Sequence, residues 1–293
     1  MGHYPHDPRC SHCVQARLKE RARKRQLGRV IEGPGEGLKI SSDLMGPFPA
    51  CLLAKTFAMN AIDSESSWCE VDGVEGKGSA ETSKVFESLI ADLRIWGNQP
   101  NKRVVRIHTD MGGEYKKHFQ TLCKKLGARK TGTGGYMSKA NPQAELFHQL
   151  GQGGMRALLG QATHGSDVYF KDLWLLALKH HVFWLNRAGS KDRESPYKKV
   201  WGKDYEVHPN DHNFGSLCYY KIDKAALINK GDMRGEPAIW VGRDLNTGGH
   251  IVVPISWVYN ENKFELFQPK TVKTVKVEDG NYILRKGPGR ICG

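Results

Sequence analysis

Residues 102–115 read KRVVRIHTDMGGEY, a stretch that joins a short apolar run to an acidic residue and two glycines. The run over 102–110 predicts a strand that ends on Asp110. Gly112 and Gly113 follow closely, and glycine lets the backbone approach a neighbouring group. The stretch therefore places a carboxylate at the end of a strand, next to a turn.

The segments on either side extend this strand into a sheet with helices. Short strands separated by turn residues are predicted at 38–44, 55–63, 66–74 and 128–133. Apolar spacing predicts helices at 79–97 and 114–127, and two more that begin near Pro142 and Phe170. A meander of strands followed by alternating helices and strands predicts an α/β fold with a mixed sheet flanked by helices.

The pattern changes near residue 201 to short strands with turns, which predicts a small β-barrel-like region. A Gly/Pro/Glu joint, EGPGEG at 32–37, marks an earlier boundary. The expected organisation is a His/Cys and basic segment (1–36), an α/β core (37–200), a β-rich region (201–280) and a tail (281–293).

Charge and composition narrow the class of partner. The 293 residues hold 44 Lys plus Arg against 31 Asp plus Glu, a formal net charge of +13, which favours a polyanionic partner. No apolar run approaches a membrane span and the first residues lack the apolar stretch of a signal peptide, so nucleic acid is favoured over a membrane. Five of the seven cysteines stand far apart, as in a reduced intracellular protein.

Three carboxylates fall where a metal site would need them. Asp43 lies at the end of the first predicted strand, Asp110 ends the fourth, and Glu145 stands one turn inside a helix capped by Asn141. Strand ends and a helix start can meet at one edge of a sheet, and hard divalent cations prefer several oxygen ligands. Each acid alone has an ordinary explanation, as a turn former or as a favourable charge near a helix start.

The sequence segments around these acids resemble those of the integrases of retroviruses and of copia-type retrotransposons. The similar segments run in the family's order from about residue 37 into the 270s: SDLMGPFP (42–49), NAIDSESSWCEV (60–71), RIHTDMGGEY (106–115), NPQAELFHQLGQGGMRALL (141–159), LWLLALKHHVFWLNR (173–187), SPYKKVWG (195–202), FGSLCYYKI (214–222) and PAIWVGRD (237–244).

The resemblance implies a ribonuclease-H-like core followed by a small β-barrel. It carries Asp43, Asp110 and Glu145 over as catalytic acids that bind Mg²⁺ or Mn²⁺. It also implies 3′-end processing and strand transfer on element ends and target DNA, by a homo-oligomer acting in the nucleus. Asp63, Glu70 and Glu114 are not carried over and are interpreted as turn, surface and support residues, in that order.

Departures from the family pattern leave a second interpretation open. Pro142-Gln143 precede Ala144 where the family has Asn-Gly, and Leu146 follows the acid where a basic or polar residue is usual. Three glycines in the same helix, Gly151, Gly153 and Gly154, each weaken it by roughly 1 kcal/mol relative to alanine. The alternative is therefore a catalytically decayed or domesticated DNA-binding remnant.

Two further elements precede the core. His3, His6, Cys10 and Cys13 supply the nitrogen and sulfur ligands of a Zn²⁺ site, or else belong to a plain tail. Six cations follow, and they are predicted to contact DNA phosphates or to act as an import signal: Arg17, Lys19, Arg21, Arg23, Lys24 and Arg25. Gln149 and Arg156 continue the Glu145 helix and are further candidates for DNA contact.

Overall fold

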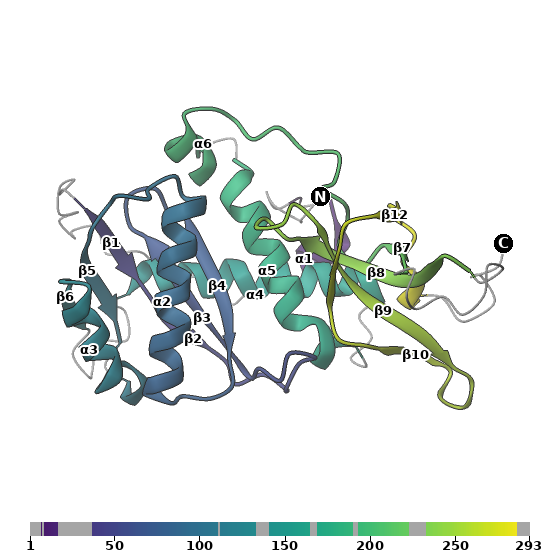
Figure 1. Cartoon of the computed structure of the whole chain (residues 1–293), viewed down its shortest axis with the longest axis horizontal. Coiled ribbons are helices and arrows are strands. Elements are labelled where there is room, and N and C mark those ends of the chain that lie inside the picture. Colours follow the sequence, from purple (N-terminus) through teal and green to yellow (C-terminus); the bar gives the residue numbers. More distant parts are fainter. Residues whose placement is uncertain are drawn as a thin grey trace.

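Two six-stranded sheets organise the chain, one on each side of a pair of long helices (Figure 1). The computed structural model describes residues 7, 9–16, 37–110, 112–132, 141–164, 169–189, 193–222 and 233–285. The predicted cations Arg17 to Arg25 and the histidines His3 and His6 lie outside these residues.

The first sheet contains β1 (Leu38–Ser41), β2 (Leu44–Met45), β3 (Phe57–Asp63), β4 (Cys69–Val74), β5 (Val104–Thr109) and β6 (Arg129–Gly132). Strand β3 pairs antiparallel with β1, β2 and β4, whereas β5 pairs parallel with both β1 and β6. An antiparallel meander thus continues into a parallel half, because helices connect the later strands. This is the predicted mixed sheet.

Strands β1 and β2 follow one register against β3 and are interrupted only at residues 42 and 43. Ser41 pairs with Ile62 and Leu44 with Met59, so Asp43 stands opposite Asn60. The sequence predicted one strand over 38–44. The interruption releases the backbone around Asp43 from the regular ladder without shifting the strand.

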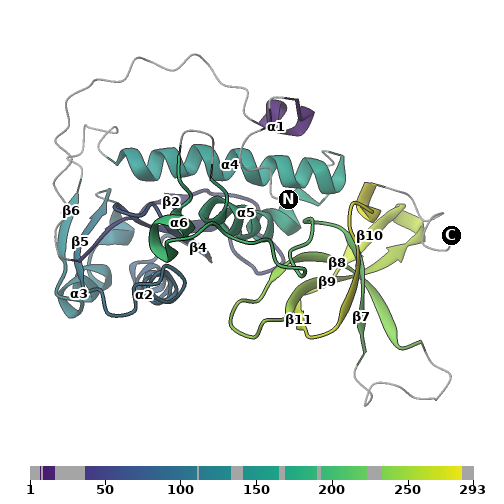
Figure 2. The same ribbon diagram turned by 90° about the horizontal axis from the view of Figure 1, so that it is seen from above.

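Helices cover both faces of this sheet (Figure 2). On one face α2 (Ser79–Trp96) and α3 (His118–Lys125) pack against it through Phe86, Leu89 and Phe119, which are buried. On the other face lie α4 (Pro142–Thr163) and α5 (Phe170–Arg187). The helix predicted over 114–127 is divided, because a 3₁₀ turn, η1 (Gly113–Tyr115), precedes α3 and Lys117 between them has a φ of 43°.

The glycines of α4 allow it to approach α5 closely. A Cβ atom on Gly154 would stand 2.1 Å from the ring of His181 on α5, and one on Gly151 would stand 3.2 Å from Leu178. Both glycines and His181 are buried. Their helix-weakening effect, predicted from the sequence, therefore accompanies a close contact that no larger residue would allow at Gly154.

The second sheet is antiparallel and contains β7 (Leu217–Lys221), β8 (Gly235–Arg243), β9 (His250–Val258), β10 (Lys263–Leu266), β11 (Lys270–Val272) and β12 (Val275–Glu278). Strand β11 pairs with β9, and β12 pairs with β7 at the other side of β8. Because only two residues separate β11 from β12, the sheet curls back on itself. This agrees with the predicted barrel-like region.

Helix α5 joins the two sheets in one hydrophobic core. Its buried residues Leu173, Leu176 and Leu178 belong to the same cluster as Ile239 and Val253 of the second sheet. The short helix α6 (Pro196–Trp201) and an extended segment cross from α5 to β7. The regions predicted at 37–200 and 201–280 thus share a core.

Three short elements complete the described chain: α1 (Ser11–Ala16), which packs on α4, η3 (Tyr259–Glu261) and η4 (Ile283–Arg285). Within the described residues, no helix is both long and apolar enough to cross a membrane.

Candidate active site

The parallel pairing of β1 and β5 brings two of the predicted acids together. Ser41 pairs with His108, and the Ser42 amide donates to the His108 carbonyl oxygen at 2.9 Å. Asp43 follows Ser41 by two residues and Asp110 follows His108 by two, where both strands end at the same edge of the sheet. Strand register alone therefore places Asp43 next to Asp110.

Asp43 is held by its own backbone and by Asn60. The Asp43 amide donates to Asn60 Oδ1 at 3.1 Å, and the Asn60 amide donates to the Asp43 carbonyl oxygen at 3.2 Å. The Leu44 amide donates to Asp43 Oδ1 at 2.8 Å, which fixes the carboxylate. The side chain thus has a defined orientation at the interruption of the strand.

The pKa of Asp43 is raised to about 6, chiefly because burial penalises its charged form. The Leu44 amide works against this rise, whereas the negative charges of Asp110 and Glu114 add to it. The register of β1 and β5 accounts for the effect of Asp110, and Glu114 follows Asp110 by four residues.

Glu114 joins these acids through the turn after Asp110. The Gly112 amide donates to Asp110 Oδ1 at 3.0 Å, which closes the turn. A Cβ atom on Gly112 would stand 2.5 Å from Glu114 Oε2, so only glycine lets the buried Glu114 carboxylate fold back here. The sequence had given Glu114 a supporting role, and the structure places it in the same acidic group as Asp43 and Asp110.

Two lysines are close enough to influence this group. Lys130 of β6 donates to the Tyr115 carbonyl oxygen and lies 5.8 Å and 5.7 Å from the ring centres of Tyr115 and Phe119. Burial lowers the pKa of Lys130, and the charge of Asp110 opposes that fall. The second is Lys77, whose charge also opposes the raised pKa of Asp43.

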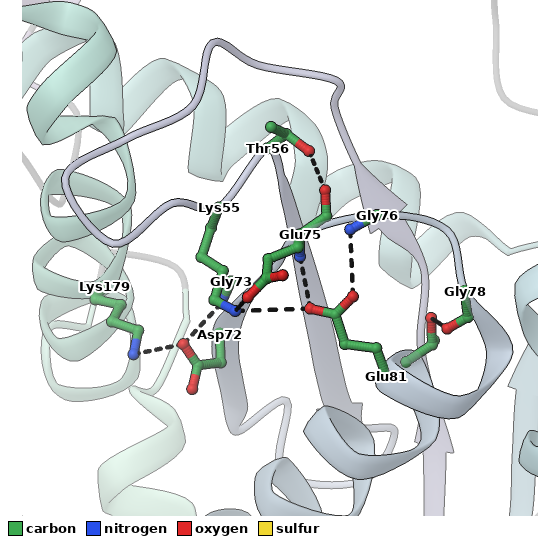
Figure 3. A network of polar contacts seen from close by, with 10 residues as sticks. Lys55, Thr56, Asp72, Gly73, Glu75, Gly76, Gly78, Glu81 and Lys179 are labelled. Atoms are coloured by element: carbon green, nitrogen blue, oxygen red, sulfur yellow. Dashed lines mark hydrogen bonds and ion pairs between the residues drawn. The ribbon is translucent and has the colours of Figure 1, made fainter.

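Lys77 belongs to the loop between β4 and α2, which a polar network holds in place (Figure 3). Glu81, in the first turn of α2, accepts from the Glu75 amide at 2.7 Å and from the Gly76 amide at 3.3 Å. Lys55 Nζ donates to Glu75 Oε1 at 2.8 Å. The network fixes the loop that carries Lys77, whose Nζ lies 5.5 Å from the ring centre of Phe57.

The first turn of α4 is fastened to the end of β1. Gln143 Oε1 accepts from Ser41 Oγ at 3.0 Å and from Ser64 Oγ at 2.9 Å. Asn141 Nδ2 donates to the Ser42 carbonyl oxygen at 3.3 Å, so its side chain binds the sheet and does not cap the helix as predicted. Pro142 and Gln143, which depart from the family pattern, thus belong to a built junction.

Glu145 stands on the helix face that faces the sheet edge. It follows Asn141 by four residues and precedes His148 by three, so the three are neighbours on the helix. His148 Nε2 lies 3.9 Å from Asp43 Oδ2. Glu145 itself is partly exposed.

The acids are not assembled into a complete metal cage. Among the residues that the structure describes, no three His, Cys, Asp or Glu side chains converge at metal-binding distance. Asp43 and Asp110 are brought together, Glu114 joins them, and Glu145 stands on the adjoining face of α4.

The other predicted site residues are dispersed. Gln149 and Arg156 are exposed on α4, where Arg156 Nη2 donates to Gln152 Oε1 at 3.3 Å. Cys13 is buried and Cys10 is partly buried at α1, while His3 and His6 lie outside the described residues. His12, which the sequence analysis did not single out, lies against Gly160 of α4, and burial lowers its pKa.

The sequence matches no protein-family model, and no curated protein matches it. The structure is similar to the catalytic core domain of BIV integrase, with 19% identity and a TM-score of 0.41, over 57% of this chain and 95% of that chain. It is also similar to a chain of a simian T-cell lymphotropic virus intasome, determined with PP2A regulatory subunit B56 gamma. That match has 17% identity and a TM-score of 0.42, over 85% of this chain and 83% of that chain. The fold assignment rests on the strand order and directions described above.

Proposed function

We propose that this chain is the integrase of a copia-type retrotransposon, which processes DNA 3′ ends and joins them to target DNA. The observation that carries the proposal is the register of β1 and β5, which sets Asp43 beside Asp110 at one sheet edge. Helix α4 is fastened to that edge by Gln143 and carries Glu145. The sequence segments that resemble copia-type integrases support the same function.

The residues present fit a divalent cation. Asp43, Asp110 and Glu145 supply hard oxygen ligands, which suit Mg²⁺ or Mn²⁺. Burial is the main cause of the raised pKa of Asp43, and the negative charges of Asp110 and Glu114 add to it; a bound cation would offset their repulsion. When bound, such ions supply Lewis-acid assistance to the attacking and leaving oxygens.

The chain's own groups hold this arrangement. The Leu44 amide orients the Asp43 carboxylate, and the Gly112 amide orients that of Asp110. The reaction consists of two in-line attacks at phosphorus. Water first breaks a P–O3′ bond of the donor strand and frees its 3′-hydroxyl, and this hydroxyl then attacks a target phosphate and displaces the 3′-oxygen of the target strand. Neither attack needs a covalent enzyme intermediate.

The surplus of +13 supplies affinity for the DNA backbone. Arg17 to Arg25, together with Gln149 and Arg156, are proposed phosphate contacts. The active form is proposed to be a homo-oligomer on two DNA ends in the nucleus, with Zn²⁺ at the His3, His6, Cys10 and Cys13 segment.

The test is Glu145→Gln, Asp43→Asn and Asp110→Asn in Mn²⁺ with a labelled donor DNA end. Each variant should lose nearly all cleavage and joining, because each removes a charged ligand, while DNA binding is retained. Glu87→Gln, at an exposed position of α2, is the matched control and should keep full activity. Equal activity of Glu145→Gln and wild type would remove Glu145 from the site.

The second candidate is a DNA-binding remnant without catalysis. It is favoured by one observation: within the described residues, three metal-ligating side chains do not converge. Wild-type chain that binds donor DNA but neither cleaves nor joins it in Mn²⁺ would establish this candidate. Cleavage without joining would instead identify a nuclease.

A further inference from the structure

His148 has a ring nitrogen for which the fold supplies no partner. His148 Nε2 is fully buried and has no hydrogen bond within the described part of the chain. Its side chain is 21% exposed and lies on α4 next to the buried Phe147. A buried polar atom left without a partner costs roughly 1–3 kcal/mol, so such an atom calls for an explanation.

The unpartnered nitrogen faces the acidic group. His148 Nε2 is 3.9 Å from Asp43 Oδ2, which is beyond hydrogen-bond distance. The orientation is not accidental, because Gln143 and Asn141 fix the start of the same helix on the end of β1. These contacts therefore set the distance between the Asp43 and His148 side chains.

The width of this gap suits one bound cation. Oxygen and nitrogen ligands lie roughly 2.0–2.2 Å from Mg²⁺, Mn²⁺ or Zn²⁺. Two ligands of one such ion are then about 3 Å apart when adjacent and about 4.2 Å apart when opposite. The 3.9 Å between Asp43 Oδ2 and His148 Nε2 lies between these two separations, so a small movement of either side chain would bring both atoms into the coordination shell of one ion.

We propose that His148 is a nitrogen ligand of the divalent cation bound at Asp43. This inference rests on the proposed function, since it concerns the same metal site. It converts an all-carboxylate site into one with mixed nitrogen and oxygen ligands. Imidazole binds Mn²⁺ and later first-row ions more readily than Mg²⁺, so the site should prefer Mn²⁺.

The first experiment measures metal binding by the full chain without DNA. Mn²⁺ binding is followed by electron paramagnetic resonance, and pulsed measurements detect the nitrogen of a coordinated imidazole. Wild type should show this nitrogen signal, and His148→Gln should lose it. The Mn²⁺ Kd of His148→Gln should rise at least tenfold and its Mg²⁺ Kd less than threefold.

His118→Gln is the matched control, because His118 is an exposed histidine on α3, away from α4. It should keep both the nitrogen signal and the Mn²⁺ affinity. His148→Asn provides a second variant if His148→Gln does not give a folded chain by circular dichroism. A nitrogen signal that persists in either folded His148 variant, or an unchanged Mn²⁺ Kd, would overturn the proposal.

Asp43→Asn separates this inference from the proposed function. If Asp43→Asn abolishes Mn²⁺ binding but wild type shows no coordinated nitrogen, His148 is not a ligand and the carboxylate site stands. If Asp43→Asn leaves Mn²⁺ binding unchanged, the metal site of the proposed function is wrong, and the role of His148 falls with it.

Discussion

Glu70 shows how one residue's surroundings can differ from what its sequence context indicates. It lies on β4 and accepts from Trp68 Nε1 at 2.8 Å, beside a cavity of about 240 Å³ between α5 and β8. Burial raises its pKa to about 7, and the charge of Asp92 adds to the rise, while Arg187 opposes it. Glu70 is partly exposed and lines this cavity with residues of α5 and β8, so the interpretation of Glu70 as a surface residue holds only in part.

The raised pKa makes Glu70→Gln a pH-dependent stabilising change. Wild type keeps the favourable contribution of neutral Glu70 below its ordinary pKa of 4.5 and loses it as pH rises through about 7. The glutamine variant has no such loss. The quantity to compare is the free energy of unfolding of Glu70→Gln minus that of wild type. This difference should be up to about 3 kcal/mol larger at pH 8 than at pH 4.5.

Denaturant unfolding at several pH values between 4.5 and 8 checks this expectation. Glu87→Gln, on the exposed face of α2, is the control and should follow wild type. If the free energies of unfolding of Glu70→Gln and wild type changed by the same amount with pH, the folded protein would not penalise the Glu70 charge.

The positions of Asp43 and Asp110 at the ends of two strands could be predicted from the sequence, but the parallel pairing that brings these strands together is seen only in the structure. Glu114 and His148 could not be predicted in the same way. The position of Glu114 depends on the turn closed by Gly112, and that of His148 on how α4 is rotated against β1. Both depend on contacts between residues distant in the chain or on turn geometry, which apolar spacing does not encode.

At the scale of elements, the contact between α4 and α5 leads to a paired prediction. Gly154→Ala should destabilise the chain by about 1–3 kcal/mol, since its new methyl group would stand 2.1 Å from the His181 ring. The new methyl group of Gly151→Ala would stand 3.2 Å from the end of the flexible Leu178 side chain and 3.7 Å from the Phe147 ring, which is an ordinary contact. Gly151→Ala should be neutral or stabilise by up to about 1 kcal/mol through helix propensity.

Thermal unfolding followed by circular dichroism compares the two glycine variants directly. The pair is matched, because both add one methyl group to the buried face of the same helix. Similar unfolding temperatures for the two would mean that α4 and α5 do not approach as closely at Gly154 as the structure indicates.

Element boundaries were predicted well where a local signal existed, as for α2, which ends before Gly97. They were missed where the backbone departs from a regular form for a distant reason. The division of the 114–127 helix at Lys117 and the interruption of β1 at Asp43 are two such places. Both adjoin the acidic group, where ordinary local preferences are overridden by contacts between elements.

For the whole molecule, the shared core predicts one cooperative unfolding transition. Ile239→Ala on β8 removes a fully buried side chain from the cluster that α5 also joins. It should cost about 2–5 kcal/mol. The loss should reach the first sheet as well, so amide exchange in β1 and β5 should quicken together with that in β8.

Val207→Ala is the control for this prediction, because Val207 is 59% exposed. It should change stability by less than about 0.5 kcal/mol. Protection in β1 and β5 that stays at the wild-type level in Ile239→Ala would show that the two sheets unfold independently.

The charge of the chain leads to a separate prediction for DNA binding. Removing the cations at 17–25 should reduce the dependence of log K on log salt concentration by up to about 5, since each phosphate contact contributes about 0.9. Binding to a labelled duplex between low and moderate salt measures the slope. An unchanged slope would mean that these residues do not contact the backbone.

Because α5 packs against both sheets, it is synthesised before the second sheet that buries part of its surface. The ribosome completes α5 at Arg187, but Ile255 of the second sheet, which belongs to the same hydrophobic cluster, is added 255 − 187 = 68 residues later. At about 5–20 residues per second this interval lasts roughly 3–14 s. During that time the nascent chain exposes the apolar face of α5 to solvent, so a chaperone that shields this face should increase the yield of folded protein.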